Sequence, residues 1–187
     1  MMIFLILAPY AAFATLMLFA SAATSLFVSA AICLAVIAFD VFRGRSIKVL
    51  GAGSAILFAA LGCYVTLVEA GLSGTEVKLS VDVGVLAISL ASILVRRPFT
   101  QQYAREVVDA ETAQLPGFVK ANYVITWAWT ACFVLMVLAN VLLIYLPGLP
   151  LWIGIAVAFA ARNTAVYFTK WYPRYRARLE TPAAEAA

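Results

Sequence analysis

Histidine is absent from this sequence of 187 residues, and charged residues make up only 12% of it. Without an imidazole the chain has no histidine ligand for haem, zinc or a di-iron centre, and no histidine general base. The three cysteines, Cys33, Cys63 and Cys132, are far apart in apolar runs, so we interpret them as small packing residues. The sequence therefore predicts no metal site and no cofactor.

Charge is scarce because hydrophobic residues dominate: they form 65% of the chain, and the mean hydropathy is +1.01. Soluble domains of this length do not have such a composition. About 20 apolar residues span the ~30 Å hydrocarbon layer of a bilayer, so the chain has room for about six crossings. The sequence predicts an all-α fold: a polytopic membrane helix bundle of about six transmembrane helices plus a short amphipathic cytoplasmic helix.

Six apolar runs separated by turn-forming residues support this prediction. They cover residues of about 2–20, 22–42, 49–69, 79–95, 122–146 and 151–170. We expect one transmembrane domain over 1–178 and a disordered cytoplasmic tail over 179–187. The break between the first two runs, at residues 21–25, is only weakly polar and carries no charge. A five-crossing alternative with one long first element therefore stays open. No Lys or Arg lies in residues 1–20, so a retained first helix is expected instead of a secretion signal.

The basic residues indicate the orientation of the bundle. Six crossings place three basic clusters on one side, and the positive-inside rule makes that side and both termini cytoplasmic. The clusters are Arg43, Arg45 and Lys48; Arg96, Arg97, Arg105 and Lys120; and Lys170, Arg174, Arg176 and Arg178. Because these residues flank helix ends as membrane anchors, the expected partners are anionic phospholipids on the cytoplasmic side, with no nucleic acid.

Arg162 is a charged residue within the last apolar run. Counted from Leu151, it lies roughly 16 Å along the helix, close to the bilayer midplane. A charge there costs at least ~2.5 kcal/mol unless it is paired or hydrated. It shares a helix face with small residues, which predicts that it points into the bundle, and we expect this face to touch a similar small-residue stripe in the third run.

The polar residues at a similar depth are candidate partners of Arg162. Two interpretations stay open: a pocket that holds the anionic group of a lipid or small solute, or a structural ion pair that fixes helix register. The predicted pocket residues are Arg162, Glu69, Asp82, Asn140 and Asn163.

The segment after the fourth run is a candidate interfacial or partner surface. Phe99, Tyr103 and Val107 recur every four residues and Pro98 can open a helix, which predicts an amphipathic helix on the inner membrane surface. It is either a connecting helix or a docking site for a partner. The surface residues are Arg96, Arg97, Pro98, Phe99, Tyr103 and Arg105.

Catalytic patterns are weak throughout the chain. No paired carboxylates share a helix face in the membrane runs, and no glycine-rich phosphate loop follows a strand. A serine nucleophile would need a lysine base, and the lysines lie near the ends of the runs. We therefore expect no enzyme and no catalytic residues.

The order of features resembles the intracellular septation protein A (YciB-like) family of bacterial inner-membrane proteins. The segments that carry the resemblance are Leu7-Ala8-Pro9, the basic loop from Arg43 to Lys48, Arg96-Arg97-Pro98, residues 122–129 and Leu138-Ala139-Asn140. Arg97, Pro98 and Asn140 match positions that the family tends to share.

This resemblance implies a non-enzymatic scaffold in the inner membrane that acts in septation, cell division and cell-envelope maintenance. Its implied partners are division or envelope-synthesis membrane proteins, and a homo-oligomer is left open. The alternative function, which comes from the residues alone, is a small-solute or lipid transporter or channel with a polar pocket around Arg162.

Overall fold

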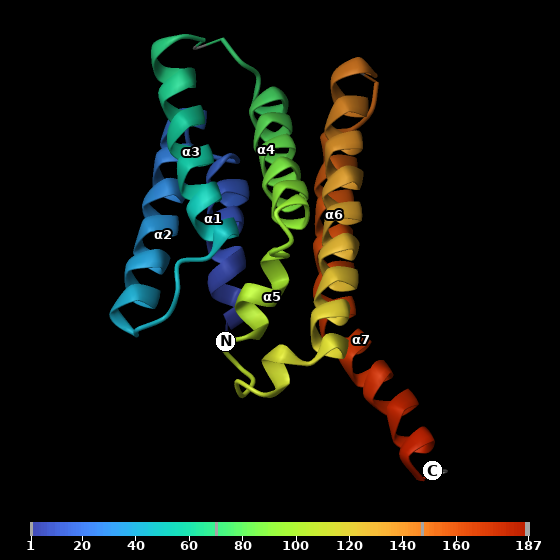
Figure 1. Ribbon diagram of the computed structural model, residues 1–187. Coiled ribbons are helices and arrows are strands. Elements are labelled where there is room, and N and C mark those ends of the chain that lie inside the picture. Colours follow the sequence, from blue (N-terminus) through green and yellow to red (C-terminus); the bar gives the residue numbers. More distant parts are fainter. Residues whose placement is uncertain (1, 70, 147, 186–187) are drawn as a thin grey trace.

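The computed structural model describes residues 2–69, 71–146 and 148–185, and every regular element in these parts is a helix. The helices run up and down beside one another (Figure 1). They are α1 (Met2–Leu16), α2 (Ala22–Phe42), α3 (Val49–Leu67), α4 (Gly74–Leu94), α5 (Phe99–Ala104), the 3-10 helix η1 (Thr112–Gln114), α6 (Pro116–Tyr145) and α7 (Leu151–Glu185). The predicted all-α class is confirmed.

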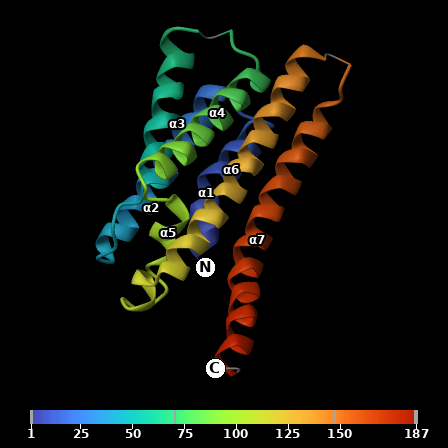
Figure 2. The same ribbon diagram turned by 45° about the vertical axis from the view of Figure 1, so that its right-hand side comes forward.

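Five helices, α2, α3, α4, α6 and α7, are long and apolar enough to cross a membrane. The 15 residues of α1 span about 22 Å, but a backbone hydrogen bond from Ala20 to Leu16 continues its last turn. Figures 1 and 2 show α1 running among the other helices. Large apolar side chains such as Leu34, Ile56 and Leu135 are exposed on the outside, where lipid would cover them. The protein is a polytopic membrane helix bundle with about six transmembrane helices.

Both chain termini lie at one end of the bundle (Figure 1). This end also carries the loop between α2 and α3, the short helix α5 and the last part of α7. The basic residues of the sequence gather here: Arg43, Arg45 and Lys48 lie in the loop between α2 and α3, Arg96, Arg97 and Arg105 flank α5, Lys120 lies near the start of α6, and Lys170, Arg174, Arg176 and Arg178 lie in the second half of α7. We call this end of the bundle the basic end.

Ser21 separates α1 from α2. Its side chain accepts a hydrogen bond from the backbone N–H of Thr24 at 3.1 Å, which caps the first turn of α2. The two helices then pack against each other as an antiparallel pair. The alternative with one long first element is therefore wrong.

Two helices begin earlier than the apolar runs predicted. α4 begins at Gly74 because Ser73 and Glu76 form a capping box, in which the Ser73 N–H donates to Glu76 Oε2 at 2.7 Å. α6 begins at Pro116, a residue whose fixed φ suits the first helical turn. Hydropathy alone misses such turns because their residues are polar or small.

α7 also ends later than its apolar run, because the helix continues to Glu185. Disorder was predicted for residues 179–187, and the structure instead has helix over 179–185. The last two residues of that tail lie outside the described residues.

The predicted short helix after Pro98 is present as α5, but it is shorter than the apolar repeat predicted and is partly buried. α5 ends at Ala104, and Val107, which was expected on its apolar face, lies outside it and is exposed. Phe99 is buried and packs edge-on against Trp129 of α6, with ring centroids 6.4 Å apart. The Thr100 hydroxyl donates to the Asn122 carbonyl at 2.9 Å. These contacts pack α5 against α6 at the basic end of the bundle.

The small-residue stripes of α3 and α7 pack on different helices, so the expectation that they touch is wrong. A Cβ atom added to Gly62 of α3 would lie 3.0 Å from the Phe27 ring of α2. A Cβ atom at Gly154 of α7 would lie 2.5 Å from Leu143 of α6. Each stripe thus lets its helix approach the neighbour that precedes it in the chain.

Two positive-φ residues at the basic end allow a test of local backbone strain. Gly44 (φ 69°) follows α2, and Arg96 (φ 56°) follows α4. A left-handed residue just past a helix favours glycine. We expect Arg96→Gly to raise the free energy of unfolding by about 1 kcal/mol and Gly44→Ala to lower it by about the same amount. Thermal unfolding in detergent measures both, and equal shifts in the same direction would contradict the assignment.

Candidate functional site

A cavity of about 440 Å³ lies between α1, α4, α6 and α7. α7 packs on α6 and α1 packs on α2, and both α1 and α7 contribute residues to the wall of the cavity. Their contribution to its wall is mainly apolar and includes Leu7, Ala11, Ile155 and Phe159. We call it the Arg162 cavity, and its apolar walls suit a hydrocarbon chain.

Polar side chains converge on one region of the Arg162 cavity. Asp82 and Asn140 are buried, and the Asn140 Nδ2 donates to Asp82 Oδ2 at 2.7 Å and to the Met136 carbonyl at 3.2 Å. Both protons of this amide group are therefore used, which fixes the orientation of the Asp82 carboxylate. Lys78 lines the same cavity one turn before Asp82.

Arg162 lies in this cavity as predicted, half-buried, with its guanidinium carbon 6.0 Å from the centre of the Tyr10 ring. The Asp82 charge attracts it through space. Within the parts of the chain that the structure describes, however, none of the ion pairs involves Arg162. Lys78 and Arg162 thus place two positive charges against the one carboxylate of Asp82. The arrangement favours an additional negative charge in the cavity.

The structure brings together four of the five predicted pocket residues: Arg162, Asp82, Asn140 and Asn163. Asn163 is at the exposed rim, where its Nδ2 donates to the Phe159 carbonyl at 2.8 Å. The prediction of Glu69 as a partner is wrong. α3 ends at Leu67, so Glu69 lies beyond the helix, exposed and outside the cavity lining.

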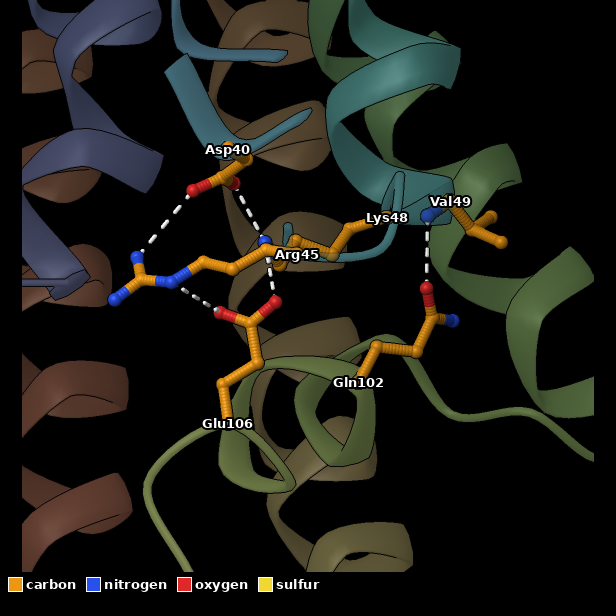
Figure 3. Close-up of polar contacts among 6 residues, drawn as sticks. All are labelled: Asp40, Arg45, Lys48, Val49, Gln102 and Glu106. Atoms are coloured by element: carbon orange, nitrogen blue, oxygen red, sulfur yellow. Dashed lines mark hydrogen bonds and ion pairs between the residues drawn. The ribbon is translucent and has the colours of Figure 1, made fainter. Parts of the chain in front are cut away.

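A second polar site, which the sequence did not reveal, is a largely buried group of four charged residues at the basic end, of which Arg45 is the most exposed. We call Asp40, Arg45, Lys48 and Glu106 the charged cluster (Figure 3). The Lys48 Nζ lies 2.5 Å from Asp40 Oδ2 and 2.7 Å from Glu106 Oε1. Arg45 is more exposed to solvent than Lys48 and contacts the same two carboxylates at 3.4 and 3.6 Å. Lys48 is only 4% exposed, so it is not the membrane anchor that its basic loop suggested.

A small cavity of about 30 Å³ adjoins the charged cluster within the bundle. Asp40, Tyr10, Ser54 and Tyr103 line it, and the hydroxyls of Tyr10 and Ser54 are hydrogen-bonded to each other. Such a volume with several polar groups is enough for one water molecule. Polar groups therefore extend through the small cavity from Asp40 of α2 to Tyr10 of α1.

The predicted partner surface is only partly a surface. Arg96, Arg97 and Arg105 are exposed as expected, but Pro98 and Phe99 are buried. Tyr103 is mostly buried beneath Lys48, whose Nζ lies 5.5 Å from the ring centre. Burial raises the pKa of the Tyr103 hydroxyl above its usual value, so it stays neutral. The prediction is wrong for Pro98 and Phe99, because α5 turns them toward α6.

Comparisons of the chain with protein-family models, with curated proteins and with solved structures gave no match. No group of side chains that could hold a metal ion occurs in the described ranges of the chain. The Arg162 cavity and the charged cluster are therefore the features from which function is argued.

Proposed function

We propose that this protein binds an anionic amphiphile in the Arg162 cavity. The guanidinium of Arg162 holds the anionic headgroup, and the apolar walls of α1 and α7 hold the hydrocarbon chain. The observation that carries the proposal is Arg162 itself: it is a cation deep in a membrane helix, lines an open cavity and has no ion-pair partner in the described chain.

The chemistry of the cavity supports an anion over a cation. Arginine presents a planar fork of donors that matches phosphate and carboxylate groups. Asp82 could compete for the fork, but Asn140 already donates to its Oδ2 atom. Because a charge near the bilayer midplane is costly unless it is paired, a bound headgroup stabilises Arg162 and is itself retained.

The proposed location is a bacterial inner membrane with the basic end in the cytoplasm. The positive-inside rule supports this orientation, because the basic clusters of the sequence fall at that end. The Arg162 cavity extends from Arg162 to Leu18, Thr75 and Leu151, which lie near the opposite end. In this orientation, the amphiphile enters from the periplasmic half of the membrane.

Photo-crosslinking with a diazirine-bearing phosphatidic acid in phosphatidylcholine nanodiscs tests the proposal. We expect Arg162→Gln to weaken binding about tenfold, since it removes the cation and keeps a polar side chain of moderate length. Arg174→Gln is the matched control, because Arg174 lies on the same helix, is exposed and is outside the cavity. Equal crosslinking of wild type and a folded Arg162→Gln variant would refute the proposal.

A scaffold role in septation and envelope maintenance is a second proposal, based on the family resemblance. Arg96, Arg97 and Arg105 support it, since they are exposed at the basic end where a membrane partner could bind. Co-purification from native membranes tests it. We expect division or envelope-synthesis proteins to be recovered with wild type and lost when the three arginines are replaced by glutamine.

A further inference from the structure

Tyr10 of α1 lies between the Arg162 cavity and the small cavity. Its ring centre lies 6.0 Å from the guanidinium carbon of Arg162, its hydroxyl is hydrogen-bonded to Ser54, and the residue lines the small cavity. Leu7 of the same helix lines the Arg162 cavity, whereas Ile6 and Pro9 line the small cavity. α1 therefore divides two cavities, one beside Arg162 and one beside Asp40.

The charged cluster adjoins the small cavity through Asp40 and joins two segments that are far apart in the sequence. Asp40, Arg45 and Lys48 belong to the end of α2 and to the loop before α3, while Glu106 follows α5. A hydrogen bond from the Val49 N–H to Gln102 Oε1 at 2.8 Å adds a second link between the same segments (Figure 3). Breaking both links would release the segment that follows α5.

We propose that the charged cluster is the closed gate of a transport path, and that the protein carries its anionic amphiphile from the Arg162 cavity past Tyr10 to the basic end. This inference rests on the proposed binding function and adds movement across the membrane to it. The structure then corresponds to a state with the Arg162 cavity accessible and the basic end closed.

The charges of the cluster suggest how the gate opens. Two cations and two carboxylates neutralise one another, and buried ions persist only when they are paired. An anionic headgroup that arrives beside Lys48 and Arg45 can take the place of Glu106, so that both cations remain paired. Glu106 is the carboxylate that moves, because it lies in a loop, whereas Asp40 is part of α2.

Pro9 makes α1 the element that lets the headgroup pass. A proline within a helix lacks the backbone N–H that would bond to the preceding turn, so the helix bends there more easily. The residue after it is Tyr10, which separates the two cavities. Bending at Pro9 would break the Tyr10–Ser54 hydrogen bond and connect them.

A reversible crosslink across the gate tests this inference. In a variant with Cys33, Cys63 and Cys132 replaced by alanine, Val49→Cys and Gln102→Cys are joined with a short, reducible bifunctional methanethiosulfonate. Transfer of NBD-labelled phosphatidic acid between leaflets of phosphatidylcholine vesicles is followed by dithionite quenching. We expect the crosslink to stop protein-dependent transfer, reductant to restore it, and photo-crosslinking at the Arg162 cavity to persist in both states.

Glu106→Gln provides the opposite change at the same gate. Removing one carboxylate charge weakens the link to Lys48 without changing the size of the side chain, so we expect transfer to rise about threefold with unchanged binding. Glu111→Gln, at an exposed position before η1, is the matched control and should transfer like wild type.

The outcomes separate the gate from the binding function. If Arg162 is needed for binding but transfer is no faster than in protein-free vesicles, or is unaffected by the crosslink, the gate is wrong and the binding proposal stands. If phosphatidic acid crosslinks equally without Arg162, the binding proposal fails, and the transport path that depends on it fails too.

Discussion

Lys48→Met is expected to lower the free energy of unfolding by about 3–5 kcal/mol, the usual cost of removing one partner from a buried ion pair. Lys48 is 4% exposed and contacts Asp40 and Glu106 at 2.5 and 2.7 Å. Methionine keeps most of the side-chain volume but leaves two neighbouring carboxylates with only Arg45, whose nitrogens lie 3.4 and 3.6 Å away. Unfolding in mixed detergent micelles, followed by circular dichroism, measures the change.

A control and a rescue make this prediction specific to the charged cluster. Lys120→Met removes an exposed lysine at the same end of the bundle and should change stability by no more than about 0.5 kcal/mol. The triple variant Asp40→Asn/Lys48→Met/Glu106→Gln should recover most of the loss, because the one charge that remains, Arg45, has a side chain 29% exposed and can be hydrated. A triple variant as unstable as Lys48→Met alone would mean that methionine disturbs packing, not charge.

The fold was largely predictable because the bilayer limits what an apolar run can form. Each of the six runs overlaps a helix of the structure, since a backbone in hydrocarbon must satisfy its own hydrogen bonds. The ends of the helices were less predictable. Ser73 with Glu76 and Pro116 start helices through capping and backbone geometry, which hydropathy does not measure.

The candidate site was predictable where depth alone decides which residues meet. Arg162, Asp82 and Asn140 lie at similar depths on helices that line one cavity, so their placement in the bundle brings them together. The prediction for Glu69 was wrong because α3 ends before this residue, which moves its carboxylate out of the helical register. A capping or turn signal after Leu67 could have revealed this.

The charged cluster could not be predicted because it depends on tertiary structure. Lys48 and Arg45 have the sequence pattern of membrane anchors, and only the packing of α5 at the basic end brings Glu106 to them. The available signal was Asp40, an acidic residue at the end of an apolar run beside a basic loop. A lone acidic residue among bases at a helix end is worth examining as a member of a buried ion pair.

Asp82→Asn is expected to tighten binding of phosphatidic acid about tenfold, the opposite of the effect of Arg162→Gln. The carboxylate of Asp82 repels an anionic headgroup, and two unit charges ~6 Å apart interact by about 1.4 kcal/mol, a factor of about ten, at an effective dielectric constant of about 40, as in an open, partly hydrated cavity. Asparagine is nearly the same size, and its carbonyl can still accept the hydrogen bond that Asn140 gives to Asp82 at 2.7 Å. The fixed geometry of the site is thereby kept while the negative charge is removed.

This pair of substitutions decides between the two interpretations of Arg162. If Asp82 and Arg162 were a structural pair, removing either charge would destabilise the bundle and weaken binding in the same direction. If Arg162 is a ligand-binding cation, Asp82→Asn strengthens binding, and the double variant Arg162→Gln/Asp82→Asn binds more weakly than Asp82→Asn alone. Each variant is titrated with phosphatidic acid in phosphatidylcholine nanodiscs, with Glu111→Gln as an exposed carboxylate control. The measured affinities show whether each substitution strengthens or weakens binding. Opposite signs require that Arg162 faces the headgroup and that Asp82 sets how tightly it is held.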